Sequence, residues 1–276
     1  NLFSEAAPGK FYLFNVRQGQ FLVRLSNNFP GLSASPAEVT VAQSGSSYTL
    51  RFADGCYLKT GYWNNQYLWT DGTASASENK WTFRPIAGMT NVYQLCRAAS
   101  ETLNGETGTF YANGTNAATS PTDDCQWALV SPTAYDDLAL ANAIPTKYRS
   151  EIPMAEGDYY LYDVLTQQFL NTANRSLSAE PAATATITPS GGSFLISGEK
   201  GKYLKIGVYK GQYLWSDGDG QSTMWTIASE PGREADKLYY LYTDNFTETN
   251  SEVAGKTMYL NGTNATSTKP SRARWM

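Results

Sequence analysis

Apolar and polar residues alternate in short runs along the whole chain, and the runs are separated by Gly, Asn, Asp and Pro. Alternation over roughly four to eight residues is typical of a half-buried β-strand, and the residues between the runs favour tight turns. The runs open near Phe11, Tyr48, Val92, Tyr159, Phe194 and Leu238. The pattern therefore predicts an all-β chain built from many short strands.

The two halves of the chain repeat one another. GKFYLFNV at Gly9 returns as GDYYLYDV at Gly157, and the NGTN segment at Asn113 returns at Asn261, 148 residues later in both cases. YLKTGYWNNQYLWTDG likewise returns as YLKIGVYKGQYLWSDG. Because the matches keep their order, one domain has been duplicated.

The segment between the copies is expected to be a linker. We place the first domain at residues 1–132, the linker at 133–155 and the second domain at 156–276. Leu138 to Ala141 favour one short helix in the linker, and the prolines that follow impose extended chain.

Each copy divides further into three units of about 40 residues. In the second unit of the first copy, short strands are expected at Tyr57–Leu58, at Tyr67–Trp69 and around Trp81, after the run that opens at Tyr48. Four strands per unit give each domain twelve short antiparallel strands in three pseudo-symmetric units, which close into a six-stranded barrel capped by three hairpins. The predicted fold is therefore two tandem β-trefoil domains.

The second unit of each copy resembles the repeat of ricin-type (R-type) lectins, in which a Leu-containing strand, a Gly, a hairpin with Leu-Trp, a second Gly and a closing Trp follow in order. The matching positions are Leu58, Gly61, Leu68, Trp69, Gly72 and Trp81, and Leu204, Gly207, Leu214, Trp215, Gly218 and Trp225. The first units, such as FYLFNVRQGQFL, are more similar to the degenerate repeats of fascin-like trefoils. The resemblance implies carbohydrate binding in shallow pockets, where an Asp and an amide hold sugar hydroxyls and an aromatic ring stacks on the sugar.

The match is incomplete at the polar positions. Trp69 and Trp215 stand where the family has its stacking ring, but Lys59 and Lys205 replace the family's Asp. An ammonium group only donates hydrogen bonds and cannot accept them from sugar hydroxyls. The amide pair before the closing Trp is also replaced, by Glu78-Asn79 and by Ser222-Thr223. The polar half of the family's galactose clamp is therefore missing.

A rearranged pocket could use other residues of the same hairpin. The aromatic and polar loop GYWNNQ is too polar for both of its rings to point into the core. For Trp69 and Trp215 a core role stays open beside the ligand role, and the Asp-Gly pairs at Asp71 and Asp217 could be simple hairpin turns. The NGTN segments are read as turns. The candidate ligand-binding residues are Tyr62, Trp63, Asn64, Gln66, Trp69, Asp71, Tyr209, Gln212, Trp215 and Asp217.

Composition argues against several classes of function. The chain has no histidine and its three cysteines lack metal-ligand spacing, so no metal site and no cofactor is expected. A net charge of −4 and a pI near 5.0 argue against nucleic acid as a partner, and no apolar run is long enough for insertion into a membrane. Without a histidine base, a phosphate loop or a nucleophile elbow, we expect no enzyme; a two-carboxylate glycosidase is the class this argument leaves open.

The cysteines leave two interpretations. Cys96 and Cys125 are predicted in the first and last strands of one unit, where a disulfide is geometrically feasible. Their apolar neighbours suit buried free thiols equally well. The odd third cysteine, Cys56, belongs to neither interpretation.

The expected function is that of a secreted or cell-surface, non-catalytic, lectin-like protein or accessory module, with a glycan or polysaccharide as partner. The alternative is a protein–protein interaction module, similar to fascin-like or protease-inhibitor trefoils, with contacts in residues 97–109, 122–126 and 243–257.

Ala128 to Val130 continue the chain after Trp127, whereas only Met276 follows Trp275. The last strand therefore looks shortened, and we expect the chain to be part of a larger polypeptide.

Overall fold

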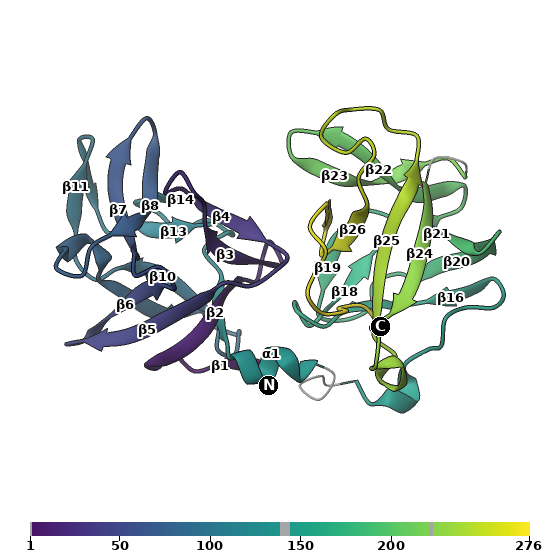
Figure 1. Cartoon of the computed structure of the whole chain (residues 1–276), viewed down its shortest axis with the longest axis horizontal. Helices are drawn as coiled ribbons and strands as arrows, with labels where there is room; N and C mark the ends of the chain where they lie inside the picture. Colours follow the sequence, from purple (N-terminus) through teal and green to yellow (C-terminus); the bar gives the residue numbers. More distant parts are fainter. Residues whose placement is uncertain (1, 139–143, 221–222) are drawn as a thin grey trace. The chain divides into compact units, whose positions relative to one another are not determined.

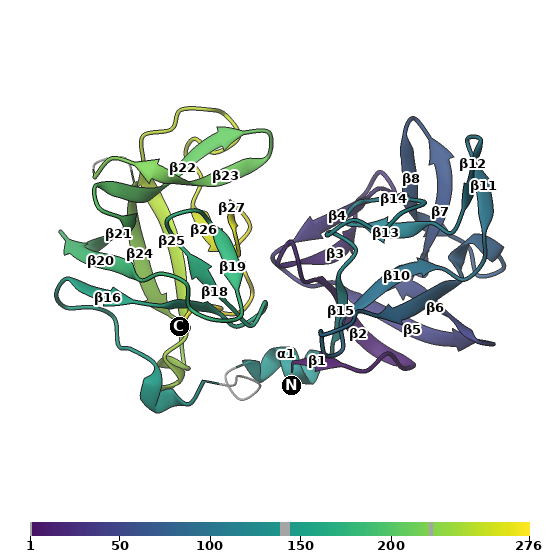
Figure 2. The ribbon, with the colours of Figure 1, turned by 180° about the vertical axis from the view of Figure 1, so that it is seen from behind.

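The computed structural model describes residues 2–138, 144–220 and 223–276. It divides into two compact units, Asn1–Asp137 (unit 1) and Leu138–Met276 (unit 2). Both are made almost entirely of antiparallel strands (Figures 1 and 2). The helices of the described residues are all too short and polar to cross a bilayer.

Unit 1 is built from three groups of four strands. The first group is β2 (Gly9–Asn15), β3 (Gln20–Arg24), β4 (Pro30–Ser33) and β5 (Glu38–Ser44). The second is β6 (Ser47–Phe52), β7 (Tyr57–Trp63), β8 (Gln66–Gly72) and β9 (Trp81–Pro85). The third is β10 (Tyr93–Arg97), β13 (Tyr111–Asn113), β14 (Asn116–Ala118) and β15 (Trp127–Val130).

The outer strands of these groups form a closed barrel. β2 pairs with β5, β5 with β6, β6 with β9, β9 with β10, β10 with β15, and β15 with β2 again. The inner strands form the hairpins β3–β4, β7–β8 and β13–β14. A six-stranded barrel capped by three hairpins is a β-trefoil, as the strand pattern predicted.

Unit 2 repeats this plan. Its strands are β16 (Gly157–Tyr159), β17 (Leu161–Asp163), β18 (Gln168–Asn171), β19 (Ser176–Ser178), β20 (Ala185–Ser190), β21 (Ser193–Glu199), β22 (Lys202–Tyr209), β23 (Gln212–Gly218), β24 (Thr223–Ser229), β25 (Tyr239–Phe246), β26 (Met258–Asn261) and β27 (Asn264–Thr266). Trp275 closes the barrel by bridging Asp163 on one side and Tyr239 on the other, and Met276 exchanges two backbone hydrogen bonds with Tyr162. The tandem β-trefoil prediction is therefore confirmed.

Buried tryptophans tie the hairpins to the barrels. Trp81 is fully buried, and its Nε1–H donates to the carbonyl oxygen of Leu58 at 2.9 Å, across the second group of unit 1. The same bond recurs from Trp127 to Ala112, from Trp225 to Leu204 and from Trp275 to Leu260. A buried indole keeps its one donor satisfied in this way, which explains why the second and third groups of each unit end on a Trp at the same place.

Several elements lie outside the twelve-strand plan. Unit 1 has an extra edge strand, β1 (Phe3–Ser4), an inserted hairpin, β11 (Glu101–Leu103) and β12 (Glu106–Gly108), and a helix, α1 (Pro132–Asp136). Three 3-10 turns lie at Ser77–Asn79, Thr146–Tyr148 and Glu234–Asp236.

Helix α1 begins earlier than the helix expected from Leu138 to Ala141, of which residues 139–141 lie outside the described residues. Ser131 caps it by accepting a hydrogen bond from Ala134 N–H at 3.1 Å, and Pro132 occupies its first turn. The start of the helix is therefore set by a serine cap followed by proline.

Part of the segment between the two copies packs on unit 2. Arg149 is buried and donates to the carbonyl oxygen of Asp236 at 2.7 Å, and Tyr239 Oη donates to the carbonyl oxygen of Ser150 at 2.9 Å. The second barrel is therefore covered by chain that precedes its first strand.

All three cysteines are free thiols. Cys96 lies in β10 and Cys125 in the turn before β15, and both are buried. Burial raises the pKa of Cys125 to about 12 and also raises the pKa of Cys96. Cys96 and Cys125 are therefore buried free thiols, the second of the two interpretations of this pair.

Candidate functional site at the second hairpin of each unit

The candidate residues of unit 1 lie on the β7–β8 hairpin. Its two-residue turn is Asn64-Asn65, and both residues have left-handed backbones with φ of 47° and 62°. Such a turn twists in the sense of the strands that it joins, and asparagine tolerates it better than most residues. The turn sets Trp63 directly opposite Gln66 at the tip of the hairpin.

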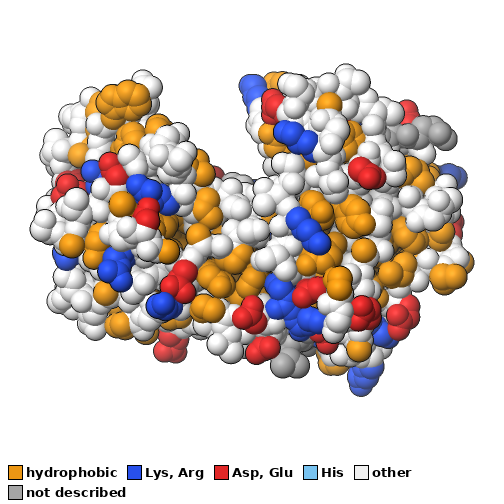
Figure 3. All heavy atoms as spheres, in the orientation of Figure 1, with side chains coloured by type: hydrophobic (Ala, Val, Ile, Leu, Met, Phe, Trp, Pro, Cys, Tyr) orange, Lys and Arg blue, Asp and Glu red, His pale blue; other side chains and the backbone are white. Residues whose placement is uncertain are grey.

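Three aromatic rings form a row along this hairpin. Trp63 is 62% exposed and its ring centroid lies 6.4 Å from that of Trp69, edge to face. On its other side Trp69 meets Phe29, at 4.8 Å between centroids. Trp69 is half-buried, and its Nε1–H donates to the Gln66 carbonyl oxygen at 3.2 Å. Figure 3 shows apolar side chains gathered over this tip of unit 1. We call Phe29, Trp63 and Trp69 the aromatic row.

Gly61 lies beside the middle ring of the row. A Cβ at this position would lie 3.4 Å from Trp69 Cδ1, and a Cβ at the equivalent Gly207 would lie 2.9 Å from Trp215 Cδ1. The indole therefore covers the glycine on the neighbouring strand. In unit 2 the ring lies too close to leave space for a side chain, whereas in unit 1 a Cβ would be in ordinary van der Waals contact with it.

Tyr62, although adjacent to Trp63, belongs to a different group of rings. It packs against Tyr67 in a tilted arrangement at 5.0 Å between centroids, and Tyr67 in turn stacks on buried Phe110 at 5.5 Å. Tyr62 is 40% exposed. The expectation that the two rings of the GYWNNQ loop do not both point into the core is confirmed by their exposure, but only Trp63 joins the aromatic row.

The lysine at the family's Asp position forms an ion pair with the candidate carboxylate. Lys59 Nζ lies 3.5 Å from Asp71 Oδ1, and Lys205 Nζ lies 3.3 Å from Asp217 Oδ1. Asp71 Oδ1 is shielded from solvent and accepts no hydrogen bond within the described residues, so the ion pair is its main polar contact. Each pair joins the two strands of its hairpin, and the carboxylate and the ammonium group neutralise one another.

Glu78 adds a negative charge close by. A hydrogen bond to its own backbone N–H is the main cause that lowers the pKa of Glu78. Desolvation opposes this shift, and a hydrogen bond to Ser77 and the charges of Lys59 and Arg97 add to it. Glu78 is therefore ionised at neutral pH. The surroundings of Lys59 hold two carboxylates and no surplus of positive charge.

The candidate amides serve the fold. Gln66 Nε2 donates to the carbonyl oxygens of Leu68 and Thr115, both at 2.7 Å, and so ties the second hairpin to the third. Gln212 repeats this with Leu214 and Thr263, at 2.8 and 3.0 Å. Since Asn64 forms the turn, none of the three amides is held ready for a ligand.

The NGTN segments are turns, as expected, and they bridge hairpins as well. Asn116 Oδ1 accepts from the N–H groups of Tyr67 and Ala117, and its Nδ2 donates to the Asn65 carbonyl oxygen at 3.0 Å. Asn264 makes the matching bonds in unit 2. Gly114, inside the first of these turns, has a φ of 61°.

An arginine network that the sequence alone does not reveal borders the aromatic row. Arg24 Nε donates to the Thr70 carbonyl oxygen at 2.9 Å, Nη1 pairs with Asp54 at 2.6 Å, and Nη2 donates to Asn28 Oδ1 at 2.6 Å. It joins the tip of β3–β4 to β8 and thereby holds Phe29 beside Trp69. Residues so far apart in the chain give no local signal, so only the fold brings them together.

The equivalent hairpin of unit 2 is less aromatic. Tyr209 is 59% exposed at its tip, but Arg175 covers Trp215, with its guanidinium carbon 4.7 Å from the ring centroid. Arg175 also donates to the Leu214 carbonyl oxygen at 2.9 Å. Asp217 stays exposed beside Lys205. The duplicated site therefore has an arginine where unit 1 has Phe29.

The positions before the closing Trp are also used by the fold. Asn79 is buried and donates to the Thr73 carbonyl oxygen at 2.7 Å, and Thr223 Oγ1 accepts from Ile206 N–H at 3.0 Å. Ser222 lies outside the described residues. No group of three His, Cys, Asp or Glu side chains that could hold a metal occurs in the described part of the chain.

Comparison with known proteins returns similarities of fold. No family model and no curated protein matches the chain. Solved structures that are similar include SeviL bound to asialo-GM1 saccharide, with 13% identity over 46% of this chain and 99% of that one and a TM-score of 0.36. A salivary protein from Culex quiquefasciatus of the Cysteine and Tryptophan-Rich family has 13% identity over 48% of this chain and 99% of its own, with a TM-score of 0.37. The designed three-fold symmetric protein ThreeFoil has 14% identity, 44% and 98% coverage and a TM-score of 0.32. Fold similarity at this level does not identify a ligand.

Proposed function

We propose that this chain is a non-catalytic glycan-binding protein whose main site is the aromatic row of unit 1. The observation that carries the proposal is the exposure of Trp63 beside Trp69 and Phe29. An exposed indole on a rigid hairpin offers a flat apolar face to the C–H groups of a sugar ring at little cost in conformational entropy.

The charges beside the row favour neutral sugars over acidic ones. Arg24 is paired with Asp54 and Lys59 with Asp71, while Glu78 stays ionised. A sulfate or carboxylate on the sugar would therefore meet negative charge and no unpaired cation among these groups. We infer a ligand that stacks on the rings and exchanges hydrogen bonds with polar groups at the rim.

The two units are proposed to differ in affinity. Arg175 occupies one side of Trp215, so unit 2 offers Tyr209 and part of one indole where unit 1 offers a continuous row. Unit 2 then acts as a weaker second site, which adds avidity toward a polysaccharide and contributes little toward a short oligosaccharide.

A glycan array with the intact chain tests the proposal, with neutral and acidic glycans side by side. Trp63→Ala should lower affinity for the bound neutral oligosaccharides at least about tenfold, because loss of a central aromatic anchor costs about 2 kcal/mol or more. Tyr148→Ala is the matched control, since Tyr148 is equally exposed and lies on neither hairpin. Binding that Trp63→Ala leaves unchanged would remove the aromatic row as the site.

A protein partner is the second candidate, and one observation favours it. The β11–β12 hairpin is an insertion of unit 1 that is largely exposed and, among the strands of the described residues, forms a two-stranded sheet of its own. Its Glu101 is anchored by Arg97 and Thr60, so the hairpin projects from a fixed base. Capture of a protein by the intact chain that a β11–β12 deletion abolishes, together with a silent glycan array, would favour this function.

A further inference from the structure

The second hairpin of unit 2 lies among different charges from its counterpart in unit 1. In unit 1, Asp54 pairs with Arg24 at 2.6 Å beside the aromatic row. The sequence repeat makes three positions of this surrounding more positive, and the residues of unit 1 and unit 2 there are Asp54 and Lys200, Asn64 and Lys210, and Glu78 and Ser222. Unit 2 therefore has a lysine at the place of the carboxylate that neutralises the arginine of unit 1.

An arginine from the first hairpin of unit 2 is held over the second hairpin. Arg175 lies in the turn between β18 and β19, and its guanidinium carbon is 4.7 Å from the ring centroid of Trp215. Stacking on an indole holds the planar guanidinium in one orientation. Nη1 donates to the Leu214 carbonyl oxygen at 2.9 Å, and Nε is shielded from solvent with no acceptor among the described residues. Most of the donors of this fixed group are therefore unused within the described structure.

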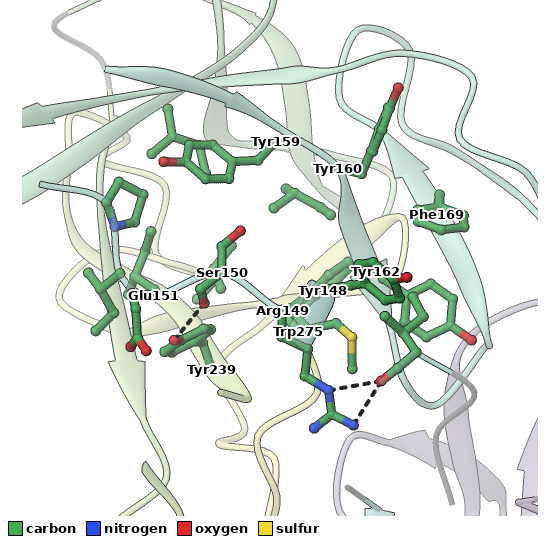
Figure 4. A pocket seen from close by; sticks show the side chains of 18 of the residues that line it. Tyr148, Arg149, Ser150, Glu151, Tyr159, Tyr160, Tyr162, Phe169, Tyr239 and Trp275 are labelled. Atoms are coloured by element: carbon green, nitrogen blue, oxygen red, sulfur yellow. Dashed lines mark hydrogen bonds between the residues drawn. The ribbon is translucent and has the colours of Figure 1, made fainter. Parts of the chain in front are cut away.

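The other arginines of unit 2 are taken up by the fold. In the pocket drawn in Figure 4, Arg149 donates from Nε and from Nη2 to the carbonyl oxygen of Ile144, both at 3.0 Å. The remaining three each pair with a carboxylate: Arg233 with Asp236, Arg272 with Glu230, and Arg274 with Asp163. Arg175 differs from all four, because in the described part of the chain its side chain has one hydrogen bond and no carboxylate partner.

The turn that carries Arg175 lies against the end of β21. A Cβ at Gly198 would lie 2.2 Å from the backbone nitrogen of Ala173, which belongs to that turn. Lys200 follows closely after Gly198 and is exposed between β21 and β22, as Asp54 is between β6 and β7. The side of the turn that holds an acid in unit 1 therefore holds a base in unit 2.

The tip of the β22–β23 hairpin adds a further cation beside an exposed ring. Lys210 Nζ lies 5.2 Å from the ring centroid of Tyr209, which is 59% exposed. Among the described residues, no carboxylate pairs with Lys210, whereas Lys205 is paired with Asp217 at 3.3 Å. The hairpin therefore presents a stacking face together with two cations, Arg175 and Lys210, that the fold does not neutralise.

Unit 2 also adds carboxylates near this hairpin. Glu199 pairs with Lys202 at 3.2 Å, and Glu252 accepts a hydrogen bond from Tyr213 Oη at 2.8 Å. Asp219, directly after β23, adds one negative charge. The first two carboxylates are therefore engaged by neighbouring side chains, and Asp219 enters the charge comparison.

The balance of charge is reversed between the two hairpins. Over the positions compared, unit 1 has two basic and three acidic residues, namely Arg24, Lys59, Asp54, Asp71 and Glu78. Unit 2 has four basic and two acidic residues, namely Arg175, Lys200, Lys205, Lys210, Asp217 and Asp219. The formal charge at neutral pH therefore changes from −1 in unit 1 to +2 in unit 2.

We propose that the β22–β23 hairpin of unit 2 binds an acidic sugar, with a carboxylate or sulfate group on Arg175 and a face of the sugar on Tyr209. The inference rests on the proposed function, since it assigns a ligand class to the second glycan site. The edge of a guanidinium donates parallel hydrogen bonds to two oxygens of such an anion. Lys200 and Lys210 raise the local potential and attract the same group. The two units then differ in ligand class as well as in affinity.

The test is calorimetric titration of the intact chain carrying Trp63→Ala, which weakens the neutral site of unit 1. Two pairs of probes differ mainly in charge: trigalacturonic acid and its methyl ester, and a galactose oligosaccharide with sulfate and the same one without it. The acidic member of at least one pair should bind about tenfold or more tightly than its neutral partner, because hydrogen bonds between a guanidinium and an anion are among the strong ones. The pair that shows the preference identifies the acidic group.

Arg175→Gln, added to this chain, removes the guanidinium and should reduce the preference to about twofold or less. Glutamine suits the left-handed backbone of Arg175, since Gln167 has a φ of 57° in a turn of the same unit and Arg175 has a φ of 59°. Arg17→Gln is the matched control. It makes the same change of charge at an exposed arginine of unit 1 that is part of neither candidate hairpin, and should keep the full preference.

Equal affinity for the acidic and neutral members of both pairs would overturn the inference. So would a preference that survives Arg175→Gln, or one that Arg17→Gln removes to the same extent, which would show attraction by overall charge. None of these results bears on neutral glycans bound by the unaltered chain, so the proposed site in unit 1 is tested separately. Acid binding that depends on Arg175 would likewise stand if Trp63→Ala left neutral glycans bound.

Discussion

Asp163 and Arg274 form an ion pair that is almost wholly removed from solvent, with side chains 0% and 1% exposed. Arg274 Nε donates to Asp163 Oδ1 at 2.9 Å, and a second bond joins Arg274 Nη2 to Asp163 Oδ2. A buried ion pair adds little net stability, but removal of one partner strands a charge in the core. The pair lies next to Trp275, the residue that closes the barrel of unit 2.

Unit 1 has uncharged side chains at these two positions, since Asn15 is the equivalent of Asp163 and Gln126 is the equivalent of Arg274. Arg274→Met should therefore cost unit 2 about 3–5 kcal/mol, while the double change Asp163→Asn with Arg274→Gln should recover most of that loss. The rate of hydrogen exchange at the Leu241 amide, in the barrel core, reports the change in the stability of unit 2 for both variants. If Arg274→Met lowers the free energy of unfolding by less than about 1 kcal/mol, the ion pair is not shielded from solvent.

The buried thiols make a second prediction for single residues. With its pKa raised to about 12 by burial, Cys125 exists as thiolate to only about one part in ten thousand at pH 8. Buried Cys96 is shifted in the same direction. A disulfide-exchange reagent should therefore label one thiol per native chain, Cys56, and label the other two only after unfolding. Rapid labelling of Cys125, located by peptide mapping, would contradict its burial.

At the scale of elements, the hairpins of each unit are held together by a few side-chain amides. Asn116 makes three hydrogen bonds, of which two join β13–β14 to β7–β8 and the third is to Ala117 N–H of its own strand. Asn116→Ala should cost about 2–3 kcal/mol, at about 1 kcal/mol per bond, and speed amide exchange at Tyr67. Asn116→Asp is the control, because it keeps both acceptor bonds and loses only the donor to Asn65. An equal loss of stability in the two variants would mean that the hydrogen bonds accepted by Asn116 Oδ1 contribute nothing.

The element pattern was largely predictable from sequence because alternation and turn residues act locally. The strands opening at Phe11, Tyr48 and Val92, and the Asn-Gly turns, lie where the pattern placed them. The inserted β11–β12 hairpin was foreseen only as a long loop, since its strands are short and polar. Contacts between elements, such as Phe29 on Trp69 or Arg175 over Trp215, could not be predicted, because each joins residues about 40 positions apart that only the closed barrel brings together.

At the scale of the whole molecule, one trefoil plan has been used twice and modified differently in each copy. Unit 1 has a continuous aromatic row, whereas unit 2 has an arginine on Trp215. The sequence repeat predicted the duplication and placed the candidate residues on matching hairpins. The repeat also predicted that the two hairpins carry equivalent sites. They differ because the residues that contact the hairpins, Phe29 and Arg175, come from the first group of strands, where the two copies are less similar.

The central claim is that the aromatic row of unit 1 is the principal glycan site. Calorimetric titration of the intact chain with a short neutral oligosaccharide from the array tests it most directly, alongside Trp63→Ala and Tyr209→Ala. The account predicts one dominant site per chain, which Trp63→Ala weakens at least about tenfold and Tyr209→Ala leaves nearly unchanged. Two equal sites, or a dominant site lost with Tyr209→Ala and kept with Trp63→Ala, would contradict it.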